Sequence, residues 1–128
     1  MIKTIDLTPR YKYKARVSRV IDGDTVELIF DLGLKTLTIQ KCRLYGINAP
    51  EKSTEEGKDS LDFLKYQLQE GATVVVATVK YKRQKWDQMQ KEKKGKYGRY
   101  LVIIYKEGLK TSVNNLMVDT ERAIKKKY

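Results

Sequence analysis

Residues 11–46, YKYKARVSRVIDGDTVELIFDLGLKTLTIQKCRLYG, contain three consecutive stretches rich in β-forming residues, and in the first of them polar and apolar residues alternate. Such stretches are typical of β-strands that turn one face toward a core. The pair Asp22-Gly23 is a turn signal between the first two stretches. A short connection around residues 31–34 separates the second stretch from the third. The segment therefore predicts an antiparallel three-stranded meander.

Downstream of the meander, the apolar spacing changes to that of a helix. Ser53 followed by Glu56 has the spacing of a capping box. Apolar residues then recur at helical intervals until a glycine closes the segment: Leu61, Leu64, Leu68 and Gly71. We expect a helix of about three turns that covers the late fifties to Glu70.

Two further strands and a second helix complete the pattern. ATVVVATVKY (72–81) and RYLVIIYKEG (99–108) are rich in β-formers, and a long basic connection lies between them. Ser112 is placed to cap a last helix that extends toward Ala123-Ile124. The order β-β-β-α-β-β-α predicts a small closed β-barrel with helices. It is the element order of a five-stranded oligonucleotide-binding (OB-fold) Greek-key barrel, here with two or three helices.

Length and charge restrict the class of protein. The chain has 128 residues, of which 41% are apolar, and this suits a single domain over residues 1–128. We expect the ends, 1–10 and 125–128, to be disordered. The net charge of +11 favours a polyanionic partner, with nucleic acid ahead of an anionic membrane. A soluble domain that is merely basic is the alternative.

Residue types that are rare or missing exclude several kinds of bond and site. The one cysteine, Cys42, cannot form an intramolecular disulfide and has the surroundings of a small core residue. The chain has no histidine, so histidine-based catalysis and the common zinc sites are excluded. The N-terminus lacks a signal-peptide pattern and no stretch is apolar enough to span a bilayer. We expect a cytoplasmic protein, with a phage or a mobile element as a fitting origin.

Charged residues are placed where the predicted strands end. Asp22 and Asp24 flank the first turn, Arg43 lies late in the third strand, Glu51 follows Pro50, and Arg99 follows a glycine. Each position has an ordinary structural explanation, such as a turn, a helix entry or a basic loop. Together, two arginines and two or three carboxylates on one barrel rim are typical of phosphate chemistry. Carboxylates hold a divalent ion, and arginines bind phosphate oxygens in a two-pronged contact.

Three motifs add a resemblance to a known family. VIDGDTVEL (20–28), RLYGINAPE (43–51) and GKYGR (95–99) resemble, in order and spacing, the motifs of the staphylococcal nuclease (thermonuclease) family. GKDSLDFLK (57–65) and VNNLMV (113–118) are similar to its two helices. The likeness runs from Arg16 to Ala123. It implies a five-stranded OB-fold barrel and calcium-dependent cleavage of DNA and RNA.

The resemblance also implies a role for individual residues. It implies that Asp24, the side chain of Asn48 and the backbone carbonyl of Ala49 are metal ligands. It implies that Glu51 is the general base and that Arg43 and Arg99 bind the phosphate. It further implies that Lys96 and Tyr97 contact a substrate phosphate.

Asn48 departs from the family pattern, which has a second metal-binding aspartate at this position. An asparagine offers a carbonyl oxygen that calcium accepts, but it adds no negative charge. We therefore expect calcium to bind more weakly than at a site with two aspartates, with substrate phosphate completing the ligand set.

The sequence thus predicts a monomeric calcium-dependent phosphodiesterase that cleaves single-stranded or frayed DNA, with RNA as a further candidate and with no membrane partner. The alternative is a catalytically weak or inactive OB-fold module that only binds nucleic acid. The basic segment 80–96 is open to two interpretations, a solvated loop or an arm that follows the nucleic-acid backbone.

Overall fold

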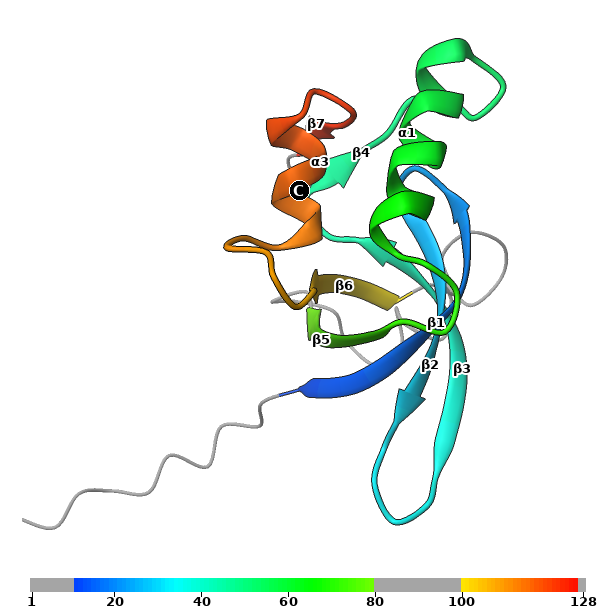
Figure 1. Ribbon diagram of the computed structural model, residues 1–128, viewed down its shortest axis with the longest axis vertical. Coiled ribbons are helices and arrows are strands. Elements are labelled where there is room, and N and C mark those ends of the chain that lie inside the picture. The colour runs from blue at the N-terminus through cyan, green and yellow to red at the C-terminus, as the bar shows by residue number, and fades with distance from the viewer. Residues whose placement is uncertain (1–10, 80–99, 127–128) are drawn as a thin grey trace, which may run out of the picture.

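The computed structural model describes residues 11–79 and 100–126. Within these residues five strands form a closed barrel in the order β1-β2-β3-β6-β5, and two helices pack near one end of it (Figure 1). The barrel strands are β1 (Lys12–Asp22), β2 (Thr25–Asp31), β3 (Leu37–Leu44), β5 (Thr73–Val79) and β6 (Tyr100–Tyr105). The helices are α1 (Glu55–Gln67) and α3 (Val113–Asp119), and a two-stranded sheet joins β4 (Ile47–Asn48) to β7 (Ile124–Lys125).

The barrel confirms the predicted fold class, and its strand order is that of an OB-fold. β1, β2 and β3 form the expected antiparallel meander. β3 then pairs in parallel with β6 over Cys42–Leu44, and β5 returns antiparallel to β1, which closes the barrel. The opposite tip of the molecule is the β2–β3 hairpin, which projects away from the helices (Figure 1).

Apolar side chains that alternate along the strands fill the barrel interior. In β1, Ala15, Val17 and Val20 are buried, and a register shift between Val17 and Arg19 accounts for the change of phase. Cys42 is fully buried, as expected of a core residue, and burial raises the pKa of its thiol to about 12. No helix within the described part of the chain has the length and apolar character needed to cross a membrane.

Helix α1 begins one residue later than the capping-box spacing indicated. Thr54, not Ser53, is the N-cap, and its hydroxyl accepts a hydrogen bond from the Gly57 amide at 3.0 Å. The helix ends at Gln67 rather than at Glu70. Gly71 then turns the chain with a φ of 81°, a conformation that favours glycine.

The last helix was predicted too long. Ser112 caps α3 as expected, because its hydroxyl accepts from the Asn115 amide at 3.1 Å, but the helix ends at Asp119. Ile124 belongs instead to β7, where it pairs with Asn48. The Lys126 amide donates to the Gly46 carbonyl at 2.8 Å and extends this pairing. Residues 127–128 and 1–10 lie outside the described residues.

Candidate active site

Asp24 lies in the tight turn between β1 and β2, and the backbone around it is well anchored. The Leu44 amide donates to the Asp24 carbonyl at 2.8 Å, which fixes the turn against the end of β3. The Asp24 amide in turn donates to the Asp22 side chain at 3.3 Å. In this Asp-Gly-Asp turn, the side chain of the first aspartate therefore holds the backbone from which the second aspartate projects.

The Asp24 carboxylate is buried and is held on both oxygens. The Thr25 hydroxyl donates to Oδ1 at 3.1 Å and the Ala49 amide donates to Oδ2 at 3.0 Å. The second bond ties the β1–β2 turn to the segment that follows β4. A buried carboxylate held by two donors is confined to one orientation, as a ligand group requires.

Arg43 lies directly opposite Thr25 in the β2–β3 ladder, so both side chains share one face of the sheet. Its Nη2 atom is 3.4 Å from Asp24 Oδ2 and also donates to Asn48 Oδ1. Its Nε atom is buried and has no hydrogen-bond partner among the described residues. A buried donor without an acceptor is rare in proteins and here offers a place for an oxygen of a bound anion.

Asp22 is the second carboxyl group at this turn. Partial burial raises its pKa, and its contact with the neighbouring Asp24 side chain raises the pKa further. Two carboxyl groups this close disfavour each other's charge. A nearby cation relieves that repulsion, so the turn is a favourable place for positive charge.

The oxygens present fit a hard divalent cation such as calcium, although the set is incomplete. Asp24 Oδ2 and Asn48 Oδ1 both contact the single atom Arg43 Nη2, so they converge on one point that already favours positive charge. Carboxylate and amide oxygens are calcium ligands. Within residues 11–79 and 100–126 no three acidic, cysteine or histidine side chains gather around one point. One carboxylate and one amide would therefore need further oxygens from the backbone, water or substrate.

Glu51 is exposed and follows the exposed Pro50. Its backbone carbonyl accepts hydrogen bonds from the Thr54 amide at 3.0 Å and from the Thr54 hydroxyl at 2.7 Å. The residue therefore stands on a short turn fixed to the start of α1. Because Ala49 is bonded to Asp24, this turn leaves the barrel end beside the Asp24–Arg43 cluster.

The structure brings together part of the predicted set. Asp24, Arg43 and Asn48 are in contact, and Ala49 is bonded to Asp24 through its amide. Glu51 follows this cluster along the chain, and its side chain is exposed. Three further predicted site residues, Arg99, Lys96 and Tyr97, lie outside the described residues, as does the basic segment 80–96. Sequence reasoning missed Thr25 and Thr54; the available signal was a hydroxyl residue directly after Asp24 and another three residues after Glu51.

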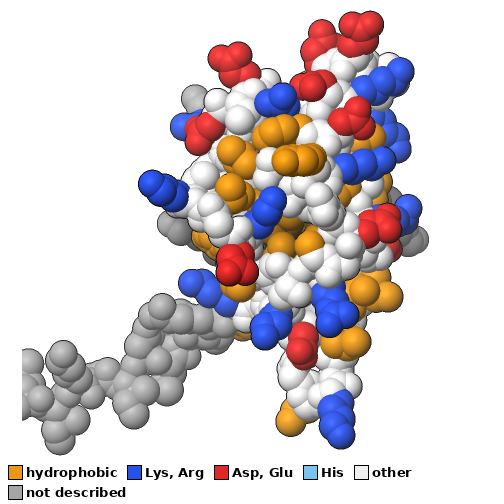
Figure 2. Space-filling model, viewed as in Figure 1, with side chains coloured by type: hydrophobic (Ala, Val, Ile, Leu, Met, Phe, Trp, Pro, Cys, Tyr) orange, Lys and Arg blue, Asp and Glu red, His pale blue; other side chains and the backbone are white. Residues whose placement is uncertain are grey.

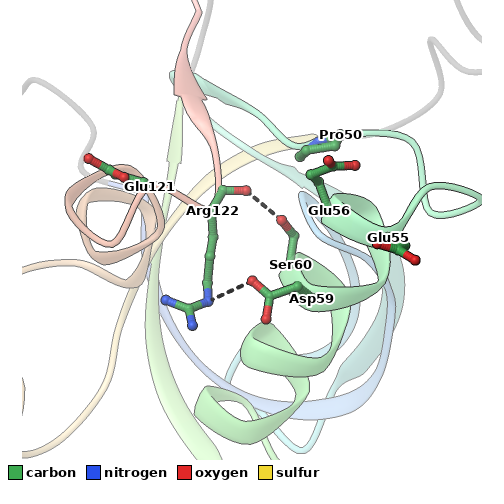
Figure 3. A pocket seen from close by; sticks show the side chains of 7 residues that line it. All are labelled: Pro50, Glu55, Glu56, Asp59, Ser60, Glu121 and Arg122. Atoms are coloured by element: carbon green, nitrogen blue, oxygen red, sulfur yellow. Dashed lines mark hydrogen bonds and ion pairs between the residues drawn. The ribbon is translucent and has the colours of Figure 1, made fainter.

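A separate pocket lies beside this cluster, between the start of α1 and the turn after α3 (Figure 3). It encloses about 360 Å³ and contains none of the predicted site residues. Four carboxyl groups line it, and the guanidinium of Arg122 is already paired with Asp59 at 3.2 Å. Figure 2 shows acidic side chains gathered at this end of the molecule. A lining of this charge repels phosphate, so the pocket is not the place for a nucleic-acid backbone.

The sequence is similar to that of known proteins. A family model described as staphylococcal nuclease homologue matches residues 41–127, which is more than half of the chain. The chain belongs to the staphylococcal nuclease family. For this family member, the match includes Arg43, Asn48 and Glu51. Asp24 lies before the matched range, so its inclusion in the candidate site rests on its geometry and its motif.

Curated relatives of the family member agree with this assignment. Two proteins named uncharacterized endonuclease, from Escherichia coli O157:H7 and Escherichia coli, are each 36% identical to it over 104 residues. The alignment covers 80% of this chain and 54% of each relative. The chain therefore spans about half the length of the curated relatives it matches.

Proposed function

We propose that the chain is a calcium-dependent nuclease that hydrolyses phosphodiester bonds in DNA, with RNA as a second candidate substrate. The observation that carries the proposal is the convergence of Asp24 Oδ2 and Asn48 Oδ1 on the Arg43 guanidinium, beside a buried Nε donor without a partner. Family membership and the relatives' printed name support the same reaction class.

The residues divide the work by charge. Arg43 binds the scissile phosphate through its guanidinium and stabilises the charge that grows in the transition state. Asp24 and Asn48, with the Ala49 carbonyl, are the residues that would hold the cation. Calcium, when bound, polarises the phosphate and offsets its charge. Arg99, Lys96 and Tyr97 are proposed as further phosphate contacts from the sequence motif.

Glu51 acts as the general base. A water oxygen attacks phosphorus while the Glu51 carboxylate accepts a proton from that water. One phosphorus–oxygen bond of the backbone breaks, and the leaving oxygen takes a proton from solvent. The exposed position of Glu51 suits this role, because the carboxylate must reach both water and substrate. We also propose that the protein acts as a monomer.

Cleavage of heat-denatured DNA in calcium, followed by addition of a chelator, tests the proposal. We expect cleavage that the chelator stops. Glu51→Gln should lower the rate by about 10²–10⁴-fold because the proton acceptor is removed. Arg43→Lys should lower it by about 10²–10³-fold because the two-pronged phosphate contact is lost. Glu107→Gln, at an exposed glutamate in a distant turn, is the matched control and should cleave like the wild type.

The second candidate is a catalytically weak or inactive module that binds nucleic acid. The absence of a second metal-binding carboxylate at Asn48 is the observation that favours it. The same assay separates the two functions. If the protein binds single-stranded DNA but shows no cleavage that a chelator stops, the result would support the binding module and contradict the nuclease.

A further inference from the structure

The turn between Glu51 and α1 is built around one hydroxyl group. Thr54 Oγ1 donates to the Glu51 carbonyl at 2.7 Å and accepts from the Gly57 amide at 3.0 Å. The Thr54 amide adds a second bond to the same carbonyl at 3.0 Å. One hydroxyl thus links the Gly57 amide, in the first turn of the helix, to the backbone of Glu51, and its donor is fully used.

Gly57 brings the same two segments into direct contact. A Cβ atom at position 57 would lie 1.7 Å from the Glu51 carbonyl oxygen and 2.3 Å from the Glu51 carbonyl carbon. It would also lie 2.8 Å from Lys52 Cα, so every clash is with backbone. Because ordinary contact starts at 3.4 Å, any side chain here must increase the separation between position 57 and the Glu51 carbonyl oxygen by about 1.7 Å.

The same helix contacts the turn that carries Asp24. A Cβ atom at Gly23 would lie 2.9 Å from Ser60 Cβ, one turn further along α1, and 2.7 Å from Ala49 Cβ. The first two turns of α1 therefore touch both the Glu51 turn and the Asp24 turn, at positions where only glycine fits. The backbone segments that carry the two carboxylates are therefore joined through α1.

We propose that Thr54 and Gly57 are positioning residues that fix Glu51 relative to Asp24. This inference rests on the proposed function, in which Glu51 is the general base. Because the Glu51 side chain is exposed, the position of its backbone sets where its carboxylate can reach. A displacement of about 1 Å at a catalytic group can cost about 10²-fold in rate.

Kinetics of four variants test the proposal. Single-turnover cleavage and the Kd for single-stranded DNA are measured for Thr54→Ala, Thr54→Ser, Gly57→Ala and Ser112→Ala. We expect Thr54→Ala to lower the cleavage rate by about 10-fold and Gly57→Ala by about 10²-fold, with the Kd changed less than about threefold. Thr54→Ser should recover most of the rate, because a hydroxyl is restored.

Ser112→Ala is the matched control. Ser112 caps α3 with the same kind of bond that Thr54 makes at α1, and Ser112 is not part of the proposed site. Losing either cap should lower stability by about 1 kcal/mol. Equal losses of cleavage rate in Thr54→Ala and Ser112→Ala would reduce Thr54 to a stabilising cap and overturn the proposal.

A double variant tests whether Thr54 acts through Glu51. If it does, Thr54→Ala should have no further effect on the residual rate of Glu51→Gln. A full, additive loss in the double variant would contradict the proposal. So would wild-type cleavage by Gly57→Ala.

Amide hydrogen exchange keeps this inference separate from the proposed function. If the wild type cleaves nothing, the nuclease proposal fails, yet the link that Thr54 makes between Gly57 and the Glu51 carbonyl can still be tested. Protection of the Gly57 amide should fall in Thr54→Ala and stay unchanged in Ser112→Ala, since the hydroxyl is its acceptor. Unchanged protection at Gly57 in Thr54→Ala would overturn the proposed positioning role of Thr54, whatever the activity.

Discussion

Asn48 and Arg43 show how single residues set the character of this site. Asn48 Oδ1 and Asp24 Oδ2 both contact the Arg43 guanidinium, so Arg43 and a divalent cation favour the same oxygens. An asparagine holds either cation less strongly than an aspartate would, because it adds no charge. We infer that Asn48 eases the transfer of Arg43 from these oxygens to a substrate phosphate.

Cys42 carries a pH prediction at the same scale. Its pKa in the folded protein is about 12 because the buried thiol resists ionisation, whereas the ordinary value is 9.0. Between these values the unfolded chain loses the proton and the folded chain keeps it. Stability should therefore be complete below pH 9.0 and fall as pH rises toward 12, by about 1.4 kcal/mol per pH unit from this group.

Urea unfolding of the wild type and of Cys42→Ala, measured between pH 8 and pH 11, checks this. Tyrosines and lysines titrate in both proteins, so the quantity compared is the difference between the two slopes. The wild type should lose more stability with rising pH than the variant. Parallel curves would show that burial does not suppress ionisation of the thiol.

At the scale of elements, sequence reasoning succeeded where a periodic pattern is long. The three β-rich stretches in residues 11–46 predicted the meander, and the order of all the elements predicted the barrel. It failed where the outcome depends on individual contacts rather than on a repeated pattern. Ser53 and Thr54 are both good caps, and the contact with the Glu51 carbonyl selects Thr54. β4 and β7 are two residues each, too short for any periodicity, so Ile124 was assigned to a helix.

Asn114 illustrates an element held by one buried side chain. Its Oδ1 accepts from the Ile104 amide at 3.1 Å, and its Nδ2 donates to the carbonyls of Tyr45 and Val102, each at 2.9 Å. These bonds attach α3 to β6 and to the turn that precedes β4. Buried backbone groups that lose such partners cost about 1–3 kcal/mol.

We therefore expect Asn114→Ala to lower the free energy of unfolding by about 2–4 kcal/mol. The neighbouring Asn115 is exposed and its side chain bonds only to the Thr111 hydroxyl among the described residues, so Asn115→Ala should change stability by less than about 0.5 kcal/mol. Chemical denaturation of both variants measures the difference. Equal effects would show that Asn114 does not hold α3 in place.

At the scale of the whole molecule, charge is unevenly distributed along the chain. Residues 80–99 contain nine basic and two acidic residues, which gives +7 of the net +11. The end of the molecule near Pro50 instead carries the acidic pocket (Figures 2 and 3). A polyanion is attracted by the charge of the first segment and repelled by that of the acidic pocket.

Two parts of the described molecule attract cations. One is the Asp24–Asn48 pair, which the proposed function requires. The other is the acidic pocket, where no three carboxyl groups of the described residues gather around one point but four of them attract cations through their charge: Glu55, Glu56, Asp59 and Glu121. Activity measurements alone cannot separate them, because calcium in either place can alter stability.

Calcium titration followed by backbone amide shifts decides between them. We predict that calcium shifts the amides of Asp24, Asn48 and Ala49, that Asp24→Asn abolishes these shifts, and that Asn48→Asp moves their midpoint to lower calcium. Shifts confined to residues 55–59 and 121, unchanged in Asp24→Asn, would contradict the assignment of the catalytic cation to the barrel end.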